Sequence, residues 1–272
     1  MPVDDLPSAP NRFLLLVGGD GARPDPSLDG GAADVVVAVD SGLHLATALG
    51  LRVHHVVGDM DSVEPAALAE AEAAGSQIHV HPADKDATDL ELALDLVLSL
   101  HQGTAGAPGE PDPDGASGAV PLLHVAGGGG GRLDHLVGDL LMLSTPRLHG
   151  WQVTAQFGSA AVSVAWPGVT TAVSGSPGEQ VSLLPIHGEA SGVTTSGLRW
   201  PLVDGHLVAG TSRGISNELA DQVATVSVDA GTVLVIRPGT RGEVLEERPG
   251  PYDPTPRPVA SNKNQNRSGE IP

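Results

Sequence analysis

The sequence predicts an α/β fold: an N-terminal, mostly parallel open sheet with flanking helices, followed by a C-terminal all-β sandwich or barrel. In the first half, apolar runs typical of buried strands alternate with helical patterns, the order expected of a parallel sheet. Four of these runs lead directly into clusters of aspartates and glycines. Beyond residue 150 the pattern changes to short β-prone runs broken by Gly and Pro, without a convincing helix.

The elements of the first half follow from buried runs and helix signals. Ser41 can cap one helix, and Pro65 suits the first turn of the next. Thr88 and Glu91 form a capping box that starts a third helix. That helix carries one apolar stripe at helical spacing, made by Leu90, Ala93, Leu94, Val97 and Leu98. We therefore predict strands at 12–17, 35–39, 53–57, 78–80 and 122–125, and helices at 42–49, 65–74, from 88 onward, and at 132–144.

The second half contains β-prone runs at 151–157, 161–166, 179–185, 192–198, 222–228 and 231–237. Gly/Pro/Asp-rich residues at 102–119 and Pro/Asn/Ser-rich residues near the C-terminus are typical of disorder. We therefore expect an α/β domain at 1–148 with a disordered loop at 102–119, a β-sandwich domain at 149–245, and a disordered tail at 246–272.

The composition restricts the possible partners. The formal net charge is −19, and residues 1–240 hold 28 acidic but only 9 basic residues. This imbalance argues against a nucleic-acid groove, because phosphate backbones are bound by clustered Lys and Arg. An acidic protein can bind a polyphosphate when divalent cations lie between its carboxylates and the phosphate oxygens. Cations are therefore expected partners.

Cysteine is absent, which excludes disulfides and thiolate metal sites. The N-terminal residues show no basic-then-apolar signal, and no apolar run is long enough to cross a bilayer. A soluble, cytoplasmic protein without a membrane partner is the expectation.

The densest candidate chemistry lies after the third and fourth expected strands. Asp59 and Asp61 stand two residues apart, so in an extended segment their carboxylates point the same way and suit a hard cation such as Mg²⁺. An ordinary turn with Asp as a cap explains this motif equally well. Asp89 follows the next strand, at a helix start where a carboxylate is favoured without any ligand. Lys85, one of two lysines in the chain, lies within this aspartate cluster and suits a phosphate contact.

A glycine run at 127–131 precedes Arg132, Asp134 and His135. Glycines such as Gly130 let backbone N–H groups approach an anion near a helix N-terminus, although a flexible linker is their usual meaning. Arg132 is a candidate phosphate ligand, and His135 taken alone is more often structural.

Weaker candidates follow the first two strands and lie in the second half. Asp40, followed by Ser41 and Gly42, has the position of a ribose or metal ligand, or of a helix cap, and Gly18 is weaker still. Trp200 is one of only six aromatic residues. A core role is the usual one for Trp, but its ring can also stack on a cationic heteroaromatic ligand.

Together, in this order, six motifs resemble the thiamine pyrophosphokinase (thiamine diphosphokinase) family: VDSG at 39–42, GDMDS at 58–62, DKDATDLELAL at 84–94, GGRLDH at 130–135, GLRWPL at 197–202 and GISNE at 214–218. The resemblance implies an ATP- and Mg²⁺-dependent homodimer with sites between its subunits. Its reaction would transfer the pyrophosphoryl group of ATP to the hydroxyl of thiamine, giving thiamine diphosphate and AMP. This chain departs from the family at Ser41, where Gly is usual, and at Asp139, where Asn is common.

The resemblance also assigns roles. It implies that Asp59, Asp61 and Asp89 hold Mg²⁺, that Arg132 and Asp134 contact the nucleotide and phosphates, and that Trp200, Ser216 and Asn217 border thiamine. We predict Asp59, Asp61, Asp89, Lys85 and Asp134 as catalytic residues. The predicted nucleotide-binding residues are Gly18, Asp40, Ser41, Gly42, Thr88, Gly130, Arg132 and His135. Two alternatives remain: a related pyrophosphokinase or pyrophosphohydrolase acting on another alcohol, such as a pterin, and an inactive nucleotide- or thiamine-binding regulator.

Overall fold

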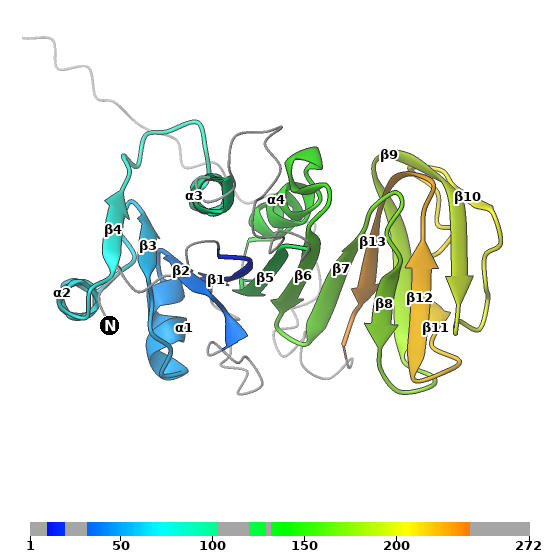
Figure 1. The fold of residues 1–272 in the computed structure, drawn as a ribbon, viewed down its shortest axis with the longest axis horizontal. Helices are drawn as coiled ribbons and strands as arrows, with labels where there is room; N and C mark the ends of the chain where they lie inside the picture. Colours follow the sequence, from blue (N-terminus) through cyan, green and yellow to red (C-terminus); the bar gives the residue numbers. More distant parts are fainter. Residues whose placement is uncertain (1–9, 20–31, 103–119, 129–131, 240–272) are drawn as a thin grey trace, which may run out of the picture.

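A computed structural model of the chain describes residues 10–19, 32–102, 120–128 and 132–239 (Figure 1). The predicted tail and nearly all of the predicted 102–119 loop lie outside these residues. Within the described part of the chain, no helix is long and apolar enough to span a membrane.

Six parallel strands form the first part of the sheet, in the order β4-β3-β2-β1-β5-β6. Valines and leucines fill the central strands because both faces of this sheet are covered. The strands are β1 (Arg12–Val17), β2 (Val35–Val39), β3 (His55–Gly58), β4 (Gln77–Val80), β5 (Leu122–Gly127) and β6 (Gln152–Phe157).

Four helices cover this part of the sheet: α1 (Gly42–Ala48), α2 (Pro65–Ala73), α3 (Asp89–Gln102) and α4 (Leu133–Leu143), and a 3₁₀ turn follows at Pro146–Leu148. The apolar side chains of α3 and α4 pack in one core cluster, and those of α1 and α2 pack in another on the opposite face (Figure 1). The sheet is thus doubly wound, an architecture in which ligands bind at the carboxyl ends of the strands.

The sheet continues without interruption into an antiparallel part, in the order β6-β7-β13-β9-β12-β8. Strand β9 pairs with β13, β12, β10 and β11, and so joins the layers of this part around a separate apolar core. The strands are β7 (Ala160–Ala165), β8 (Thr171–Ser174), β9 (Gln180–Ser196), β10 (Gly205–Leu207), β11 (Asn217–Glu218), β12 (Val223–Ser227) and β13 (Ala230–Arg237).

The predicted fold class, a parallel α/β half followed by an antiparallel β half, is confirmed. The strands differ from the expectation in two places. Strand β6, which we placed in the second half, pairs in parallel with β5 and so extends the first part of the sheet. The two runs expected at 179–185 and 192–198 form the single strand β9, because positive φ angles at His187, Gly188 and Gly192 turn the chain without ending it.

Of the two helix caps predicted from the sequence, one is formed in the structure and the other is not. The backbone N–H of Glu91 donates a 3.2 Å hydrogen bond to Thr88 Oγ1, as the capping box predicts. All five residues of the predicted apolar stripe of α3 are buried. Ser41 stands at the cap position of α1 but makes no side-chain cap hydrogen bond, so this predicted cap is wrong.

Candidate active site

A pocket of about 890 Å³ opens where the parallel strands end. Its lining comes from the segments that follow β1, β2, β3, β4 and β5, so the four aspartate- and glycine-rich clusters meet in one place, as the topology requires. The predicted site residues that line it are Gly18, Asp40, Ser41, Asp59, Asp61, Lys85, Thr88, Asp89, Arg132, Asp134 and His135.

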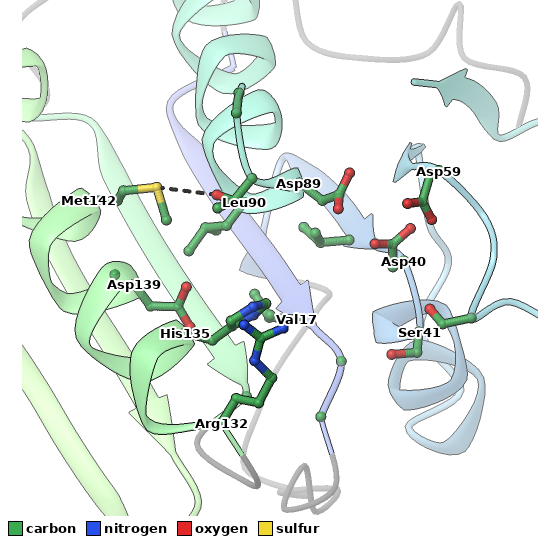
Figure 2. A pocket seen from close by; sticks show the side chains of 18 of the residues that line it. Val17, Asp40, Ser41, Asp59, Asp89, Leu90, Arg132, His135, Asp139 and Met142 are labelled. Atoms are coloured by element: carbon green, nitrogen blue, oxygen red, sulfur yellow. Dashed lines mark hydrogen bonds between the residues drawn. The ribbon is translucent and has the colours of Figure 1, made fainter. Parts of the chain in front are cut away.

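One side of the pocket carries the carboxyl groups of Asp40, Asp59 and Asp89, which Figure 2 shows. The ammonium group of Lys85 lies between two of them. Lys85 Nζ lies 3.0 Å from Asp89 Oδ1 and 3.8 Å from Asp59 Oδ2. All three side chains are largely buried, with exposed fractions of 15% for Lys85, 16% for Asp59 and 22% for Asp89. Partial desolvation opposes the charge on Lys85, but the hydrogen bond and charge of Asp89 raise its pKa overall. This lysine therefore stays protonated in the pocket.

Asp40 is the most perturbed carboxyl group of the pocket. Burial, followed by the charge of Asp89, raises the pKa of Asp40 to about 7. Its backbone has a φ of 45°, and its Oδ1 accepts a 3.3 Å hydrogen bond from the Met60 N–H. Gly58 makes room for it, because a Cβ at that position would lie 1.8 Å from Asp40 Oδ1.

The two aspartates of the GDMDS motif have opposite pKa shifts. The Asp61 N–H donates a 3.1 Å hydrogen bond to Asp59 Oδ1 and lowers the pKa of Asp59. The pKa of Asp61 is raised by a side-chain hydrogen bond to Asp59 and by the negative charge of Asp59. Such opposite shifts arise when neighbouring carboxylates compete for one environment.

The donor set of this acidic side suits Mg²⁺, which prefers carboxylate oxygens and completes its shell with water and phosphate oxygens. The charges of Asp59 and Asp89 contribute to raising the pKa values of Asp40 and Asp61, which indicates an excess of negative charge that a divalent cation would neutralise. Nevertheless, within the described residues no group of three His, Asp or Glu side chains is arranged to hold a metal ion. The positive charge between Asp59 and Asp89 is that of Lys85.

Two of the predicted glycines have steric roles. A Cβ on Gly18 would lie 1.8 Å from Ser41 Oγ, so Gly18 allows the end of β1 to approach the start of α1 beside the pocket. A Cβ on Gly42 would lie 1.9 Å from the carbonyl oxygen of Leu16. Gly42 does not line the pocket, and its closest contact explains the glycine as a packing requirement. Gly130 lies outside the described residues.

The start of α4 forms the opposite rim. Arg132 Nε donates a 3.2 Å hydrogen bond to Asp134 Oδ1, and its Nη2 pairs with the other carboxylate oxygen. This hydrogen bonding lowers the pKa of Asp134 to about 2. Both side chains are exposed, and His135 follows them at the mouth of the pocket. In this arrangement Arg132 neutralises Asp134, and an entering anion would compete for the same guanidinium.

The predicted thiamine-bordering residues lie in the antiparallel half. Trp200 and Asn217 line a separate pocket of about 260 Å³, which shares no described lining residue with the larger one. Trp200 is 52% exposed, unusual for so large an apolar side chain. The guanidinium carbon of Arg199 lies 4.7 Å from the centre of the Trp200 ring, and Arg199 Nη1 pairs with Glu218 Oε2 at 2.7 Å.

Asn217 is buried, and its amide is engaged with the backbone around Trp200. Its Oδ1 accepts hydrogen bonds from the Trp200 N–H at 3.1 Å and the Glu218 N–H at 2.8 Å. Its Nδ2 donates to the Trp200 carbonyl at 2.7 Å. Ser216 is exposed, has a φ of 59°, and does not line the small pocket. Asn217 therefore fixes the backbone position of Trp200.

The sequence reasoning did not select several residues of the large pocket. Asp139, Leu136 and Met142 line its α4 side, and Ser62 lines the acidic side. Asp139 had a visible signal, because it is the one charged residue in the otherwise apolar run at 136–143. No comparable signal distinguishes Leu136 or Met142 from ordinary core residues.

Comparison with known proteins identifies the family. The family model described as "Thiamin pyrophosphokinase, catalytic domain" matches residues 31–155. The one described as "Thiamin pyrophosphokinase, vitamin B1 binding domain" matches residues 171–233. The chain belongs to the thiamine pyrophosphokinase family. The catalytic match contains the aspartate motifs and ends within β6, and the vitamin-binding match contains Trp200 and Asn217.

Relatives of known structure extend over most of the chain. Thiamine pyrophosphokinase of Bacillus subtilis is 27% identical over 228 residues, which cover 83% of this chain and 98% of the relative. Its crystal structure superposes with a TM-score of 0.65 at 25% identity, covering 85% of this chain and 100% of that one. Thiamin pyrophosphokinase from Candida albicans, at 16% identity, shares the fold with a TM-score of 0.66 over 85% of this chain and 93% of that one.

Proposed function

We propose that this chain is a thiamine pyrophosphokinase that transfers the pyrophosphoryl group of ATP to the hydroxyl oxygen of thiamine, giving thiamine diphosphate and AMP. The observation that carries this proposal is the match of both halves of the family, in order, to the two parts of one chain. The pocket at the strand ends supports it, because it combines carboxylates with the lysine expected for polyphosphate chemistry.

In the proposed reaction, the hydroxyl oxygen of thiamine forms a bond to the β-phosphorus of ATP. The bond from that phosphorus to the oxygen bridging the α- and β-phosphates breaks, and AMP leaves. The hydroxyl proton passes to an aspartate of the pocket. Such transfers depend mainly on positioning and on stabilisation of charge on the phosphate oxygens.

Lys85 and Arg132 are the proposed cationic contacts for the phosphates. The Lys85 ammonium is fixed by Asp89 and Asp59, so its charge is already oriented when the substrate enters. Arg132 is exposed at the rim and can present the planar donor face that binds phosphate oxygens in pairs. Asp134 holds that guanidinium in place before the nucleotide arrives.

Asp59, Asp61 and Asp89 are the proposed ligands of Mg²⁺. When bound, the metal ion supplies charge neutralisation between these carboxylates and the phosphate oxygens. This role is consistent with the opposing pKa shifts of Asp59 and Asp61. Lys85 lies near one oxygen of Asp59 and one of Asp89, so these carboxylates would hold the metal while keeping Lys85 in place.

Trp200 is the proposed stacking partner of thiamine, whose permanent positive charge favours an aromatic face. Because Trp200 and the acidic pocket have separate linings within one chain, we propose a homodimer in which the sites lie between subunits. An exposed apolar stripe on α4 is consistent with a protein interface: Leu133, Val137 and Leu141 are 73%, 47% and 40% exposed at four-residue spacing.

Complementation between two inactive variants tests the shared site. Asp61→Asn and Trp200→Ala are each expected to be inactive or weak alone. If the sites are shared, a hybrid dimer contains one site in which both side chains are intact, so mixing the variants under conditions that allow subunit exchange restores activity. Sedimentation of the wild-type protein as a monomer, or mixtures no more active than their components, would reject the shared site.

The released nucleotide tests the proposed reaction. Incubation with ATP, Mg²⁺ and thiamine should release AMP, and only when thiamine is present. Thiamine-independent release would indicate a pyrophosphohydrolase, and transfer to a pterin alcohol would indicate a related pyrophosphokinase. Tight nucleotide or thiamine binding without turnover would indicate a regulator.

We also propose the domain boundaries 1–148 and 149–245 and a cytoplasmic location, to be tested by limited proteolysis and by cell fractionation.

A further inference from the structure

The large pocket has two chemically different sides. Lys85, Asp59 and Asp89 form the charged side, after β3 and β4. The side toward α4 includes the apolar residues Val17, Leu90, Leu136 and Met142, with Arg132 and His135 at the helix start, and Asp139 lies on this side. Figure 2 shows Asp139 near Met142 and His135. A nucleotide has the same division, with a charged phosphate chain at one end and a flat, largely apolar base at the other.

The carboxyl group of Asp139 lies in the pocket lining, where a ligand can contact it. It is partly buried and lines the pocket, and a Cβ built on Gly128 would lie 3.8 Å from Asp139 Oδ2. Burial raises the pKa of Asp139, with the charge of His135 acting in the opposite direction. Among the described residues, no hydrogen bond or ion pair to its carboxyl oxygens is formed. Its acceptor capacity is therefore available to a hydrogen-bond donor on a ligand.

The charge on this carboxyl restricts which part of a nucleotide it can meet. Asp139 would repel a phosphate group, and the proposed phosphate contacts are Lys85, on the other side of the pocket, and Arg132, at the start of α4. The ribose and the base are the remaining parts. The sequence places Asp40, rather than Asp139, where a ribose ligand is expected, and the apolar neighbours of Asp139 suit the flat faces of a base. A carboxylate accepts hydrogen bonds, so it favours an amino group on the base and disfavours a carbonyl oxygen at the same position.

We propose that Asp139 determines nucleobase specificity by accepting a hydrogen bond from the exocyclic amino group of the base, the N6 amino group of adenine in ATP. This inference rests on the proposed function for the identity of the nucleotide. The carboxylate contributes selectivity because the site rejects an analogue that leaves its buried acceptor without a donor.

The test compares ATP with purine riboside triphosphate, which differs only by lacking the 6-amino group. A hydrogen bond to a charged group corresponds to a preference of about tenfold to a hundredfold. We expect wild-type kcat/KM to favour ATP by that ratio, and Asp139→Leu, which keeps the size of the side chain, to reduce the ratio to about one. Asp221→Leu, at an exposed aspartate outside the pocket, is the matched control and should retain the wild-type ratio.

Calorimetric dissociation constants for both nucleotides, measured with Mg²⁺ and without thiamine, provide a readout that does not require turnover. If the chain failed to transfer pyrophosphoryl groups, the proposed function would be rejected, yet the ratio of dissociation constants would still test Asp139. Asp139→Ala replaces the leucine variant if the latter does not fold. A wild-type protein that binds both nucleotides equally, or a ratio that persists in the variants, would overturn the inference. A selective loss of thiamine affinity would overturn it too, because it would assign the carboxyl to the amino group of thiamine.

Discussion

Asn217 provides the sharpest prediction because its amide holds the backbone of Trp200 at two atoms. In Asn217→Ala, the Trp200 N–H loses its 3.1 Å acceptor and the Trp200 carbonyl loses its 2.7 Å donor. Each buried hydrogen bond contributes roughly 1 kcal/mol net. The two bonds therefore correspond to about 2 kcal/mol of positioning free energy, or about a 30-fold change in an equilibrium constant.

We expect Asn217→Ala to raise the thiamine KM by about this factor while kcat changes less than about threefold, because Trp200 lies outside the pocket proposed to bind the phosphates. The assay is AMP release at varied thiamine concentration. Tryptophan fluorescence gives a second readout: Trp200 is 52% exposed, whereas Trp151 and Trp166 are 6% and 2% exposed. Thiamine should therefore quench mainly the Trp200 emission. At a given thiamine concentration, the quenching should be smaller in Asn217→Ala than in the wild type.

Thr194→Val is the matched control, since it removes one side-chain hydrogen bond in the same half of the chain, to the Asp204 N–H at 3.1 Å. It should leave the thiamine KM unchanged. The reasoning is refuted if folded Asn217→Ala keeps the wild-type thiamine KM, or if kcat falls while KM stays constant. Either outcome would mean that Asn217 does not act through Trp200.

Three further predictions concern the charged side of the pocket and the fold. Lys85→Met should lower kcat by about a hundredfold, as for loss of one charge-stabilising group, with Lys85→Arg retaining more activity; equal kcat values for wild type and the methionine variant would remove Lys85 from the mechanism. Asp61→Asn should abolish AMP release without lowering Tm, since Asp61 is exposed, and Asp221→Asn should be fully active; a large drop in Tm would make the loss structural. His55 is 1% exposed, and burial lowers its pKa from 6.5 to about 4. The folded state therefore binds fewer protons than the unfolded state between these values, and the free energy of unfolding should fall by up to about 3 kcal/mol as pH drops from 6.5 to 4. Urea unfolding across that range, compared with His55→Leu, measures this; identical pH slopes would contradict it.

The parts of the site that the sequence predicted are those fixed by topology. Once Asp40, Asp59 and Asp89 are recognised as following strands of one parallel sheet, their convergence is required by the common direction of those strands. The apolar stripe of α3 is equally determined by local spacing, and all its members are buried. These inferences needed only periodicity and order along the chain.

What could not be predicted depends on contacts between distant residues. The pairing of Lys85 with Asp59 requires the loop after β4 to lie against the end of β3, and no local pattern specifies that distance. Similarly, nothing in the sequence of β6 tells whether it pairs with β5 or with a later strand, because short amphipathic strands suit either neighbour. The role of Asn217 was also hidden, since its partners are backbone atoms seventeen residues away.

The place of β13 in the sheet has a consequence for biosynthesis. Residues 230–237 lie between β7 and β9, which do not pair with each other, so the last described strand joins the two stretches of the sheet. A nascent chain still lacking these residues can complete the six parallel strands, but it exposes the open edge of β7 while it waits. Translation must therefore pass residue 237 before the antiparallel half can attach to the parallel half, and a stop codon before residue 230 would leave an aggregation-prone edge.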